Sequence, residues 1–249
     1  MSPPLQLVLL HPYPTDAAFW DPMRSHLRPD RRILALNAPG FGDREPQGGW
    51  TIDEAADQVA LDIRTQTPGA SAAVMGLSMG GYIALSLAVR HPEQCARLIL
   101  ADTRADADDD AGRAARYAAI SAIRAGGQDE YLEGLLLHLV ASNAEPRVSD
   151  ALVRSAARQS PDGLIGALEA LATRPDRRGD LRHLGMPTLV LVGDQDQVTP
   201  PSAARALAEG IPGARLIEVS GAGHLSALEH PEIVAREVEA FLSHAPPRS

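Results

Sequence analysis

Ala-Ala-Val-Met-Gly-Leu-Ser-Met-Gly-Gly, residues 72–81, is the stretch of sequence that decides the fold. It begins as a short apolar run typical of a buried strand, and a helical pattern follows over residues 79–90. Between them lies a G-x-S-x-G pattern in which Gly76, Ser78 and Gly80 take the defined positions. A serine on so sharp a strand-to-helix turn needs small neighbours, because a Cβ there would crowd the backbone packed behind it. The setting predicts that Ser78 is a nucleophile, whereas the pattern without that setting would indicate only a glycine-rich turn.

Similar short apolar runs alternate with helical patterns along the rest of the chain. This alternation predicts βαβ units and an α/β fold with a parallel sheet covered by helices on both faces. The expected strands are residues 5–10, 32–37, 72–76, 97–101, 188–193 and 214–219. The expected helices between them are residues 51–66, 79–90, 202–209 and 231–243. Thr51 and Glu54 predict a capping box at the start of the first of these helices.

The alternation stops between residues 103 and 180. This part of the chain contains no convincing strand, but it has helical stretches at residues 112–124, 130–140, 149–158 and 164–172. Two of them carry apolar residues at the i, i+3, i+4, i+7 spacing of a helix that packs on a neighbour. We therefore expect a core made of residues 1–102 and 181–249, and a helical cap of residues 103–180 that docks on it.

Length and charge exclude several classes of protein. The 249 residues suffice for one large domain, and two full domains are not expected. The 32 acidic and 23 basic groups give a formal charge of −9, the wrong sign for binding nucleic acid. All the basic residues are Arg, which excludes Schiff-base lysine chemistry and the lysine-containing phosphate-binding loop.

Cysteine usage and hydropathy give further expectations. The single cysteine, Cys95, cannot form an internal disulfide or a cysteine-based metal site, which fits the cytoplasm. No charged leader precedes a long apolar run, and nowhere do 18 apolar residues follow one another, so we expect neither a signal peptide nor a membrane span. No His, Asp or Glu cluster has metal-ligand spacing, and we expect no metal and no cofactor.

A serine hydroxyl is almost un-ionised at neutral pH, so Ser78 needs a base, and that base needs a third group to orient it. Of the eight histidines, His224 lies in a glycine-rich loop directly after the last predicted strand, and we expect it to be the base. Two acids, Asp194 and Asp196, follow the preceding strand, and either satisfies the chain order Ser…Asp…His. Asp102, at the end of an earlier strand, is a more remote alternative.

Four separated motifs, in order, resemble the α/β-hydrolase fold superfamily over nearly the whole chain. Residues 9–14, Leu-Leu-His-Pro-Tyr-Pro, resemble its His-Gly-x-Pro loop, and residues 37–42, Asn-Ala-Pro-Gly-Phe-Gly, resemble its Asp-x-x-Gly-x-Gly segment. The serine turn is the third motif, and residues 193–200 with 221–224 resemble the acid and histidine loops. The resemblance implies a mostly parallel central sheet flanked by helices, with a helical lid inserted after the sixth core strand.

The resemblance also implies which residues act. It favours Asp196 over Asp194 as the acid, because Asp196 lies three residues after a glycine and is followed by a proline, as in the family. The oxyanion hole would be formed by the backbone amides of Met79 and Tyr13. Pro12 stands where the family usually has glycine; it has no N–H, but the donor is expected one residue later, so the loop is stiffened and the hole is kept.

The predicted activity is hydrolysis of a small carboxylic ester through an acyl-enzyme intermediate on Ser78. We expect the rings of Tyr13 and Trp20 to line the acyl pocket. The partner is a small-molecule ester or lactone, and the sequence leaves the oligomeric state and the substrate open.

Three other activities remain open. An enol-lactonase acting on a carboxylate-bearing lactone would need a cation in the pocket, for which Arg104, Arg124 and Arg154 are candidates. A cofactor-free perhydrolase would use the same acyl-enzyme with peroxide in place of water, and Met79 after the serine is a weak indication of it. A receptor-like member of the family would use the same site to capture a ligand without turnover.

Overall fold

A single six-stranded parallel sheet forms the centre of the molecule. The computed structural model describes residues 5–66, 69 and 71–243. The strands are β1 (Leu7–Leu10), β2 (Ile33–Leu36), β3 (Ala72–Leu77), β4 (Cys95–Ala101), β5 (Thr188–Gly193) and β6 (Arg215–Val219). Their order in the sheet is β2-β1-β3-β4-β5-β6, and every neighbouring pair is parallel. All six lie where the sequence predicts a strand, so the expected α/β class is confirmed.

The strand order reverses beside β1, which pairs with β2 on one side and β3 on the other. From β1 the chain first runs outward to β2 and then crosses back over β1 to start β3. In open parallel sheets such a reversal leaves a crevice at the carboxyl ends of the two strands, where ligands bind. The loop after β1 carries Tyr13 and the turn after β3 carries Ser78, so the topology brings these two segments to that crevice.

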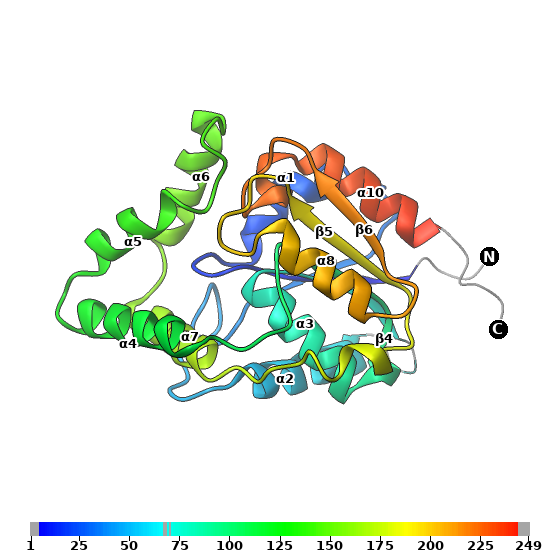
Figure 1. Ribbon diagram of the computed structural model, residues 1–249, viewed down its shortest axis with the longest axis horizontal. Coiled ribbons are helices and arrows are strands. Elements are labelled where there is room, and N and C mark those ends of the chain that lie inside the picture. The colour runs from blue at the N-terminus through cyan, green and yellow to red at the C-terminus, as the bar shows by residue number, and fades with distance from the viewer. Residues whose placement is uncertain (1–4, 67–68, 70, 244–249) are drawn as a thin grey trace.

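Helices cover both faces of the sheet (Figure 1). α1 (Asp21–Arg24) and α10 (Pro231–Ser243) pack on one face, and α2 (Ile52–Gln66), α3 (Met79–Arg90) and α8 (Pro201–Gly210) on the other. Shorter elements are η1 (Ala17–Trp20), η2 (Pro92–Gln94), η3 (Leu181–His183) and α9 (Ser226–Glu229). β1, β3 and β5 are buried along their whole length, as their unbroken apolar runs predict. Among the described residues, no helix is long and apolar enough to cross a membrane.

The predicted capping box at the start of α2 is confirmed. The Glu54 amide donates to Thr51 Oγ1 at 3.2 Å, and the Thr51 amide donates back to Glu54 Oε2 at 2.9 Å. These bonds satisfy two of the amides that a helix start leaves without partners. The helix therefore begins where the sequence places its first turn.

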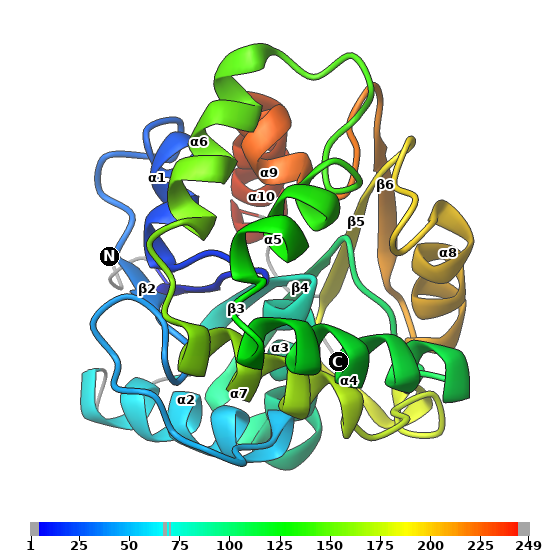
Figure 2. The ribbon, with the colours of Figure 1, turned by 90° about the vertical axis from the view of Figure 1, so that its left-hand side faces the viewer.

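Four helices lie between β4 and β5: α4 (Asp110–Arg124), α5 (Gln128–Leu136), α6 (Pro146–Ala156) and α7 (Pro161–Ala172). Residues 103–180, all of them described, contain no strand. The four helices gather at the end of the molecule toward which the strands point (Figures 1 and 2). They follow the fourth strand of this chain, not the sixth as expected, because residues 5–101 form only four strands and the other two come later.

A cluster of ion pairs around Asp108 joins the start of α4 to the end of α7. Asp108, just before α4, is buried and pairs with Arg104 at 3.0 Å, Arg116 at 3.2 Å and Arg174 at 2.8 Å. Burial alone would raise the pKa of Asp108, but the surrounding guanidinium groups hold it below its ordinary value. Arg174, just after α7, also stacks over the ring of Tyr82 in α3 at 4.5 Å. The residues before α4 and after α7 therefore contact each other, and Arg174 also contacts α3.

Candidate active site

Ser78 occupies a strained backbone position between β3 and α3. Its φ of 53° and ψ of −114° lie in a region that residues with a Cβ rarely adopt. Neighbouring elements hold it there: the Ser78 amide donates to the Ala101 carbonyl at 3.0 Å. The Ser78 carbonyl accepts from Thr103 Oγ1 at 3.0 Å and from the Tyr82 amide at 3.1 Å. The end of β4 and the first turn of α3 therefore fix the serine on the turn.

The two glycines that flank Ser78 are required by close backbone approach. A Cβ on Gly76 would lie 2.0 Å from the carbonyl oxygen of Gly80, and a Cβ on Gly80 would lie 2.0 Å from that of Leu10. Real Cβ atoms do not come so close to backbone oxygens. The G-x-S-x-G pattern therefore requires glycine at these two positions because the backbone packs too closely there to admit a Cβ.

The structure brings three predicted side chains together at the carboxyl edge of the sheet. Ser78 Oγ lies 2.8 Å from His224 Nε2, and His224 Nδ1 lies 2.8 Å from Asp196 Oδ2. His224 is 2 % exposed and Asp196 is 3 % exposed. A hydroxyl, an imidazole and a carboxylate in this series can pass the hydroxyl proton to the imidazole while the carboxylate orients the ring.

The Asp196 carboxylate is held by four donors. Its Oδ1 accepts from the amides of Val198 at 2.8 Å and Thr199 at 2.9 Å. Its Oδ2 accepts from Thr199 Oγ1 at 2.7 Å and from His224. Burial alone would raise the pKa of Asp196, but the bonds from His224 and Thr199 hold it below its ordinary value. Asp196 therefore stays ionised beside the imidazole. Thr199 is not among the residues predicted from the sequence, although a threonine three residues after an aspartate is a common side-chain turn.

The other aspartate of this loop serves a different contact. Asp194 is exposed, and its Oδ1 accepts a hydrogen bond from the Gly221 amide at 2.8 Å. That bond ties the acid loop to the turn that precedes His224. Within the described residues Asp194 makes no contact with the imidazole, so the structure brings Asp196 and not Asp194 to the histidine.

Asp102, the remote alternative, has hydrogen-bond partners other than the imidazole. It is fully buried at the end of β4 with a φ of 44°. It accepts from the Gly193 amide at 2.8 Å, from the Ser226 amide at 3.2 Å and from Ser226 Oγ at 2.5 Å. Burial raises the pKa of Asp102 well above its ordinary value, and the nearby charge of Asp196 raises it further. Asp102 joins the end of β5 to the segment that follows the histidine.

A third buried acid, Glu229, holds the residues on either side of the histidine. Its Oε1 accepts from the amides of Gly223 at 3.0 Å and Leu225 at 3.2 Å, the residues on either side of His224. Its Oε2 accepts from the Ala141 amide at 2.8 Å and from Gly223 at 3.1 Å. Because Ala141 follows α5, one carboxylate holds the histidine loop against the helical segment. Glu229 is not predicted from the sequence, where its one signal is an acidic residue in a short helix five positions after the histidine.

The two amides predicted to bind an oxyanion belong to Tyr13 and Met79. Within the described residues, neither amide donates a hydrogen bond to another group of the chain. The Pro12 carbonyl accepts three bonds, from the Thr15 amide at 3.0 Å, Thr15 Oγ1 at 2.8 Å and His11 Nδ1 at 3.0 Å. The carbonyl and N–H of a trans peptide point in opposite directions. These three bonds therefore also fix the direction of the Tyr13 N–H.

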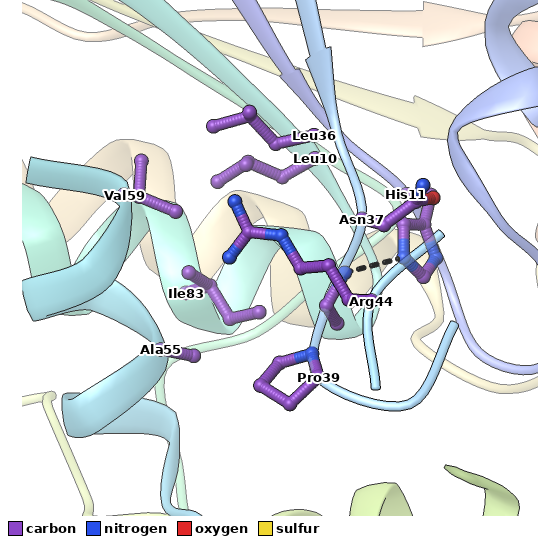
Figure 3. A pocket seen from close by; sticks show the side chains of 10 residues that line it. Leu10, His11, Leu36, Asn37, Pro39, Arg44, Ala55, Val59 and Ile83 are labelled. Carbon is purple, nitrogen blue, oxygen red and sulfur yellow. Dashed lines mark hydrogen bonds between the residues drawn. The ribbon is translucent and has the colours of Figure 1, made fainter. Parts of the chain in front are cut away.

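His11 holds this loop as a neutral imidazole. Its Nε2 accepts from the Ala38 amide at 3.0 Å, as Figure 3 shows, so the ring proton lies on Nδ1 and is donated to Pro12. Burial lowers the pKa of His11 to about 4, even though the Pro12 carbonyl acts in the opposite direction. This role of His11 is not predictable from the sequence, because a tautomer depends on partners that only the fold brings near.

The two aromatic rings expected in an acyl pocket lie mostly in the core. Trp20 is fully buried and packs edge-on against Phe19 at 5.0 Å, so the expectation that it lines a pocket is not met; the η1 turn points its ring inward. Phe19, its neighbour, lines a cavity instead. The Tyr13 ring packs edge-on against Phe41 at 6.3 Å. Burial, and next the neighbouring phenol of Tyr131, raise the pKa of Tyr13 well above its ordinary value.

The chain is similar to one protein family in sequence, and to several known proteins in sequence and structure. A family model described as alpha/beta hydrolase fold matches residues 6–231. The chain is 29 % identical over 246 residues to a pimeloyl-[acyl-carrier protein] methyl ester esterase of Neisseria meningitidis, covering 95 % of this chain and 76 % of the relative. Among solved structures, a thermophilic esterase from Thermogutta terrifontis is 30 % identical with a TM-score of 0.91, covering 96 % and 89 % of the two chains. The enol-lactonase from Burkholderia xenovorans LB400 is 27 % identical with a TM-score of 0.88, covering 97 % and 92 %.

Proposed function

The chain belongs to the alpha/beta hydrolase fold family, and we propose that it cleaves a small carboxylic ester through an acyl-enzyme on Ser78. The observation that carries the proposal is the hydrogen-bonded series from Ser78 Oγ through His224 to Asp196, with 2.8 Å at each step. The related proteins named as esterases support an ester as the bond that is cleaved. A lactone is an internal ester, so the same groups would open one.

In the first half of the reaction, Ser78 Oγ attacks the ester carbonyl carbon while His224 Nε2 takes the hydroxyl proton. The ionised Asp196 stabilises the imidazolium that forms and keeps the ring in place. As the tetrahedral intermediate collapses, the bond to the leaving oxygen breaks and the alcohol takes the proton from Nε2. The acyl group is then attached to Oγ.

In the second half, His224 Nε2 takes a proton from a water molecule whose oxygen attacks the acyl carbon. Collapse breaks the bond to Oγ, which regains the proton, and the carboxylic acid leaves. Each attack places negative charge on the carbonyl oxygen, and we assign its stabilisation to the Tyr13 and Met79 amides. One such donor contributes about 3 kcal/mol to the transition state. The cycle needs no cofactor.

We further propose that residues 103–180 act as a cap over a core made of residues 1–102 and 181–249. The support is positional: α4–α7 lie together at the end of the molecule toward which the strands point (Figure 2). The Glu229 carboxylate joins Ala141, after α5, to the histidine loop. The cap would then set which acyl and alcohol groups reach Ser78.

Turnover of p-nitrophenyl acetate by wild type and Ser78→Ala tests the proposal. Wild type should show many turnovers and Ser78→Ala none above the uncatalysed rate, and a fluorophosphonate probe should label only wild type. Ser121→Ala, an exposed serine on α4, is the matched control and should behave as wild type. Labelling without turnover would favour a receptor-like ligand-binding protein, and equal turnover by wild type and Ser78→Ala would end the proposal.

The acid is tested by a pair of isosteric changes. Asp196→Asn should lower kcat by about 10³–10⁴-fold, because the amide no longer stabilises the imidazolium or holds the reactive tautomer. Asp194→Asn keeps an acceptor for the Gly221 amide and should lower kcat by less than about threefold. A larger loss for Asp194→Asn than for Asp196→Asn would reassign the acid.

A further inference from the structure

We propose that a small cavity beside α3 binds one chloride ion. The cavity lies between the two stretches of chain that connect residues 103–180 to β4 and to β5, and we call it the junction cavity. The proposal is carried by three arginines that line this one cavity and still have N–H groups without partners. It does not depend on ester hydrolysis.

The junction cavity has a volume of about 10 Å³, which gives room for one species of about the size of a water molecule. Helices α2 and α3 contribute part of its lining, and the stretches after β4 and after α7 contribute the rest. The Arg177 amide donates to the Ala105 carbonyl at 2.8 Å. The two connecting stretches therefore lie side by side at the cavity.

Three arginines that line the junction cavity each have a buried nitrogen without a hydrogen-bond partner among the described residues. These atoms are Arg104 Nε, Arg174 Nη2 and Arg177 Nε. Guanidinium groups keep their protons in proteins, so each of these atoms is a donor that needs an acceptor. Leaving such a donor unsatisfied inside the protein costs free energy, and a ligand that accepts from it is favoured.

Ion pairs hold two of these guanidinium groups in place through other nitrogens. Arg174 Nη1 lies 2.8 Å from Asp108, and Arg177 Nη2 lies 2.6 Å from Asp53. Neither carboxylate is among the described residues that line the cavity. The two side chains are therefore positioned before a ligand binds, and the cavity side of the cluster keeps its positive charge.

Arg104 completes the set from the other connecting stretch. Its Nη2 pairs with Asp108 at 3.0 Å. Its Nε lies 3.8 Å from Asp106, which is beyond hydrogen-bond distance. The Nε proton is therefore left for an acceptor in the cavity.

The lining favours an anion over water. Of the described residues that line the cavity, three are arginines and none is acidic. A water molecule has protons of its own that need acceptors, whereas a halide only accepts, and hydrogen bonds between a charged donor and a charged acceptor are stronger than neutral ones. The volume excludes sulfate, phosphate and carboxylates, which have several heavy atoms. A chloride ion is slightly larger than water, so it needs only small shifts of the side chains around it.

A chloride ion in this cavity would join both ends of residues 103–180. Arg104 follows β4, whereas Arg174 and Arg177 precede β5, so one ion contacts both connecting stretches. Unfolding separates these arginines, and the ion then has no site. A ligand that binds only the folded chain stabilises it, and Tm rises with the ligand concentration.

Calorimetric melting of the full chain in sodium chloride tests the site, with sodium gluconate keeping the ionic strength constant. At a chloride concentration tenfold above Kd, Tm should be about 3–6 °C higher than in gluconate alone. Arg177→Lys keeps a positive charge near Asp53 but has no group in place of Nε, so chloride affinity should fall about tenfold and the shift to about 1–2 °C. Arg178→Lys is the matched control, because Arg178 is exposed and pairs with Asp176, and it should keep the whole shift.

Equal Tm of wild type in chloride and in gluconate would overturn the site, and so would an undiminished shift in Arg177→Lys. Anomalous diffraction at long wavelength from wild-type crystals grown in chloride locates the ion without any variant. A chloride peak beside Arg174 Nη2 would support the site. A cavity without that peak would overturn it, even if chloride bound elsewhere raised Tm.

Discussion

Replacing Glu229 by glutamine tests whether the histidine loop is held in place by a buried carboxylate. The two oxygens of Glu229 accept from three amides, those of Ala141, Gly223 and Leu225. Glutamine keeps the shape but retains only one oxygen, and its NH₂ group cannot accept from an amide. Whichever way the amide group turns, either Ala141 or Leu225 loses its acceptor.

The magnitude follows from this count. One buried amide left without an acceptor costs about 1–3 kcal/mol. The free energy of unfolding should therefore fall by about 2 kcal/mol, which for a chain of this length corresponds to a decrease in Tm of about 4–8 °C. Because Gly223 and Leu225 flank His224, the imidazole should also lose its fixed position, and a misplacement of about 1 Å lowers the rate by up to about a hundredfold. The expected loss in kcat is about ten- to a hundredfold.

Calorimetric melting and steady-state kinetics on p-nitrophenyl acetate measure the two effects. Glu232→Gln is the matched control, because Glu232 is exposed and has no hydrogen-bond partner among the described residues. It should change neither Tm nor kcat. A Glu229→Gln protein with the Tm and kcat of wild type would refute the reasoning, since the three amides would then not depend on the carboxylate.

Two further changes test other buried ionisable groups. His11→Gln should flatten the pH dependence of stability: the pKa of His11 is about 4 when folded and about 6.5 when unfolded, so the unfolded chain binds the proton first as pH falls. His11 therefore lowers the free energy of unfolding by about 2 kcal/mol between pH 7 and pH 5. Urea unfolding at the two pH values should show this decrease in wild type and in the exposed control His138→Gln, but not in His11→Gln. Asp108→Asn should lower the free energy of unfolding by about 3–5 kcal/mol, because Arg174, 2 % exposed, loses its carboxylate partner. Asp110→Asn is the control, because the Asp110 side chain is 98 % exposed, and urea unfolding should show almost no change in its free energy of unfolding. An equally small change for Asp108→Asn would show that the ion pairs of Asp108 do not stabilise the fold.

The fold is predictable from the sequence because its signals are local. Continuous apolar runs mark strands covered on both faces, and the helix start at Thr51 is decided by bonds that span three residues. The edge strands β2 and β6 are only partly buried, and both are shorter than predicted. Strand ends are displaced in the middle of the sheet as well: β1 begins two residues later and β4 two residues earlier than predicted, because apolar runs mark burial and not the last ladder hydrogen bond.

The residues of the site also differ in whether local sequence or tertiary packing determines their role. Ser78 and His224 can be identified because each lies in a turn that follows a recognisable strand. Glu229 and His11 cannot, because their roles depend on Ala141 and Ala38, which tertiary packing brings near. Trp20 fails for the complementary reason: sequence patterns place a residue in an element, but the direction of its ring depends on how that element docks.

The two buried aspartates near the histidine differ in the direction in which their surroundings shift their pKa values. Asp102 and Asp196 are both buried, and burial raises the pKa of each. Asp196 also accepts from His224 and Thr199, which lowers its pKa below the ordinary value, whereas the charge of Asp196 raises the pKa of Asp102 further. Environments that separate two carboxyl groups in this way divide their roles. The ionised group is the one in contact with the imidazole, which supports Asp196 as its partner and leaves Asp102 to hold Gly193 and Ser226 in place.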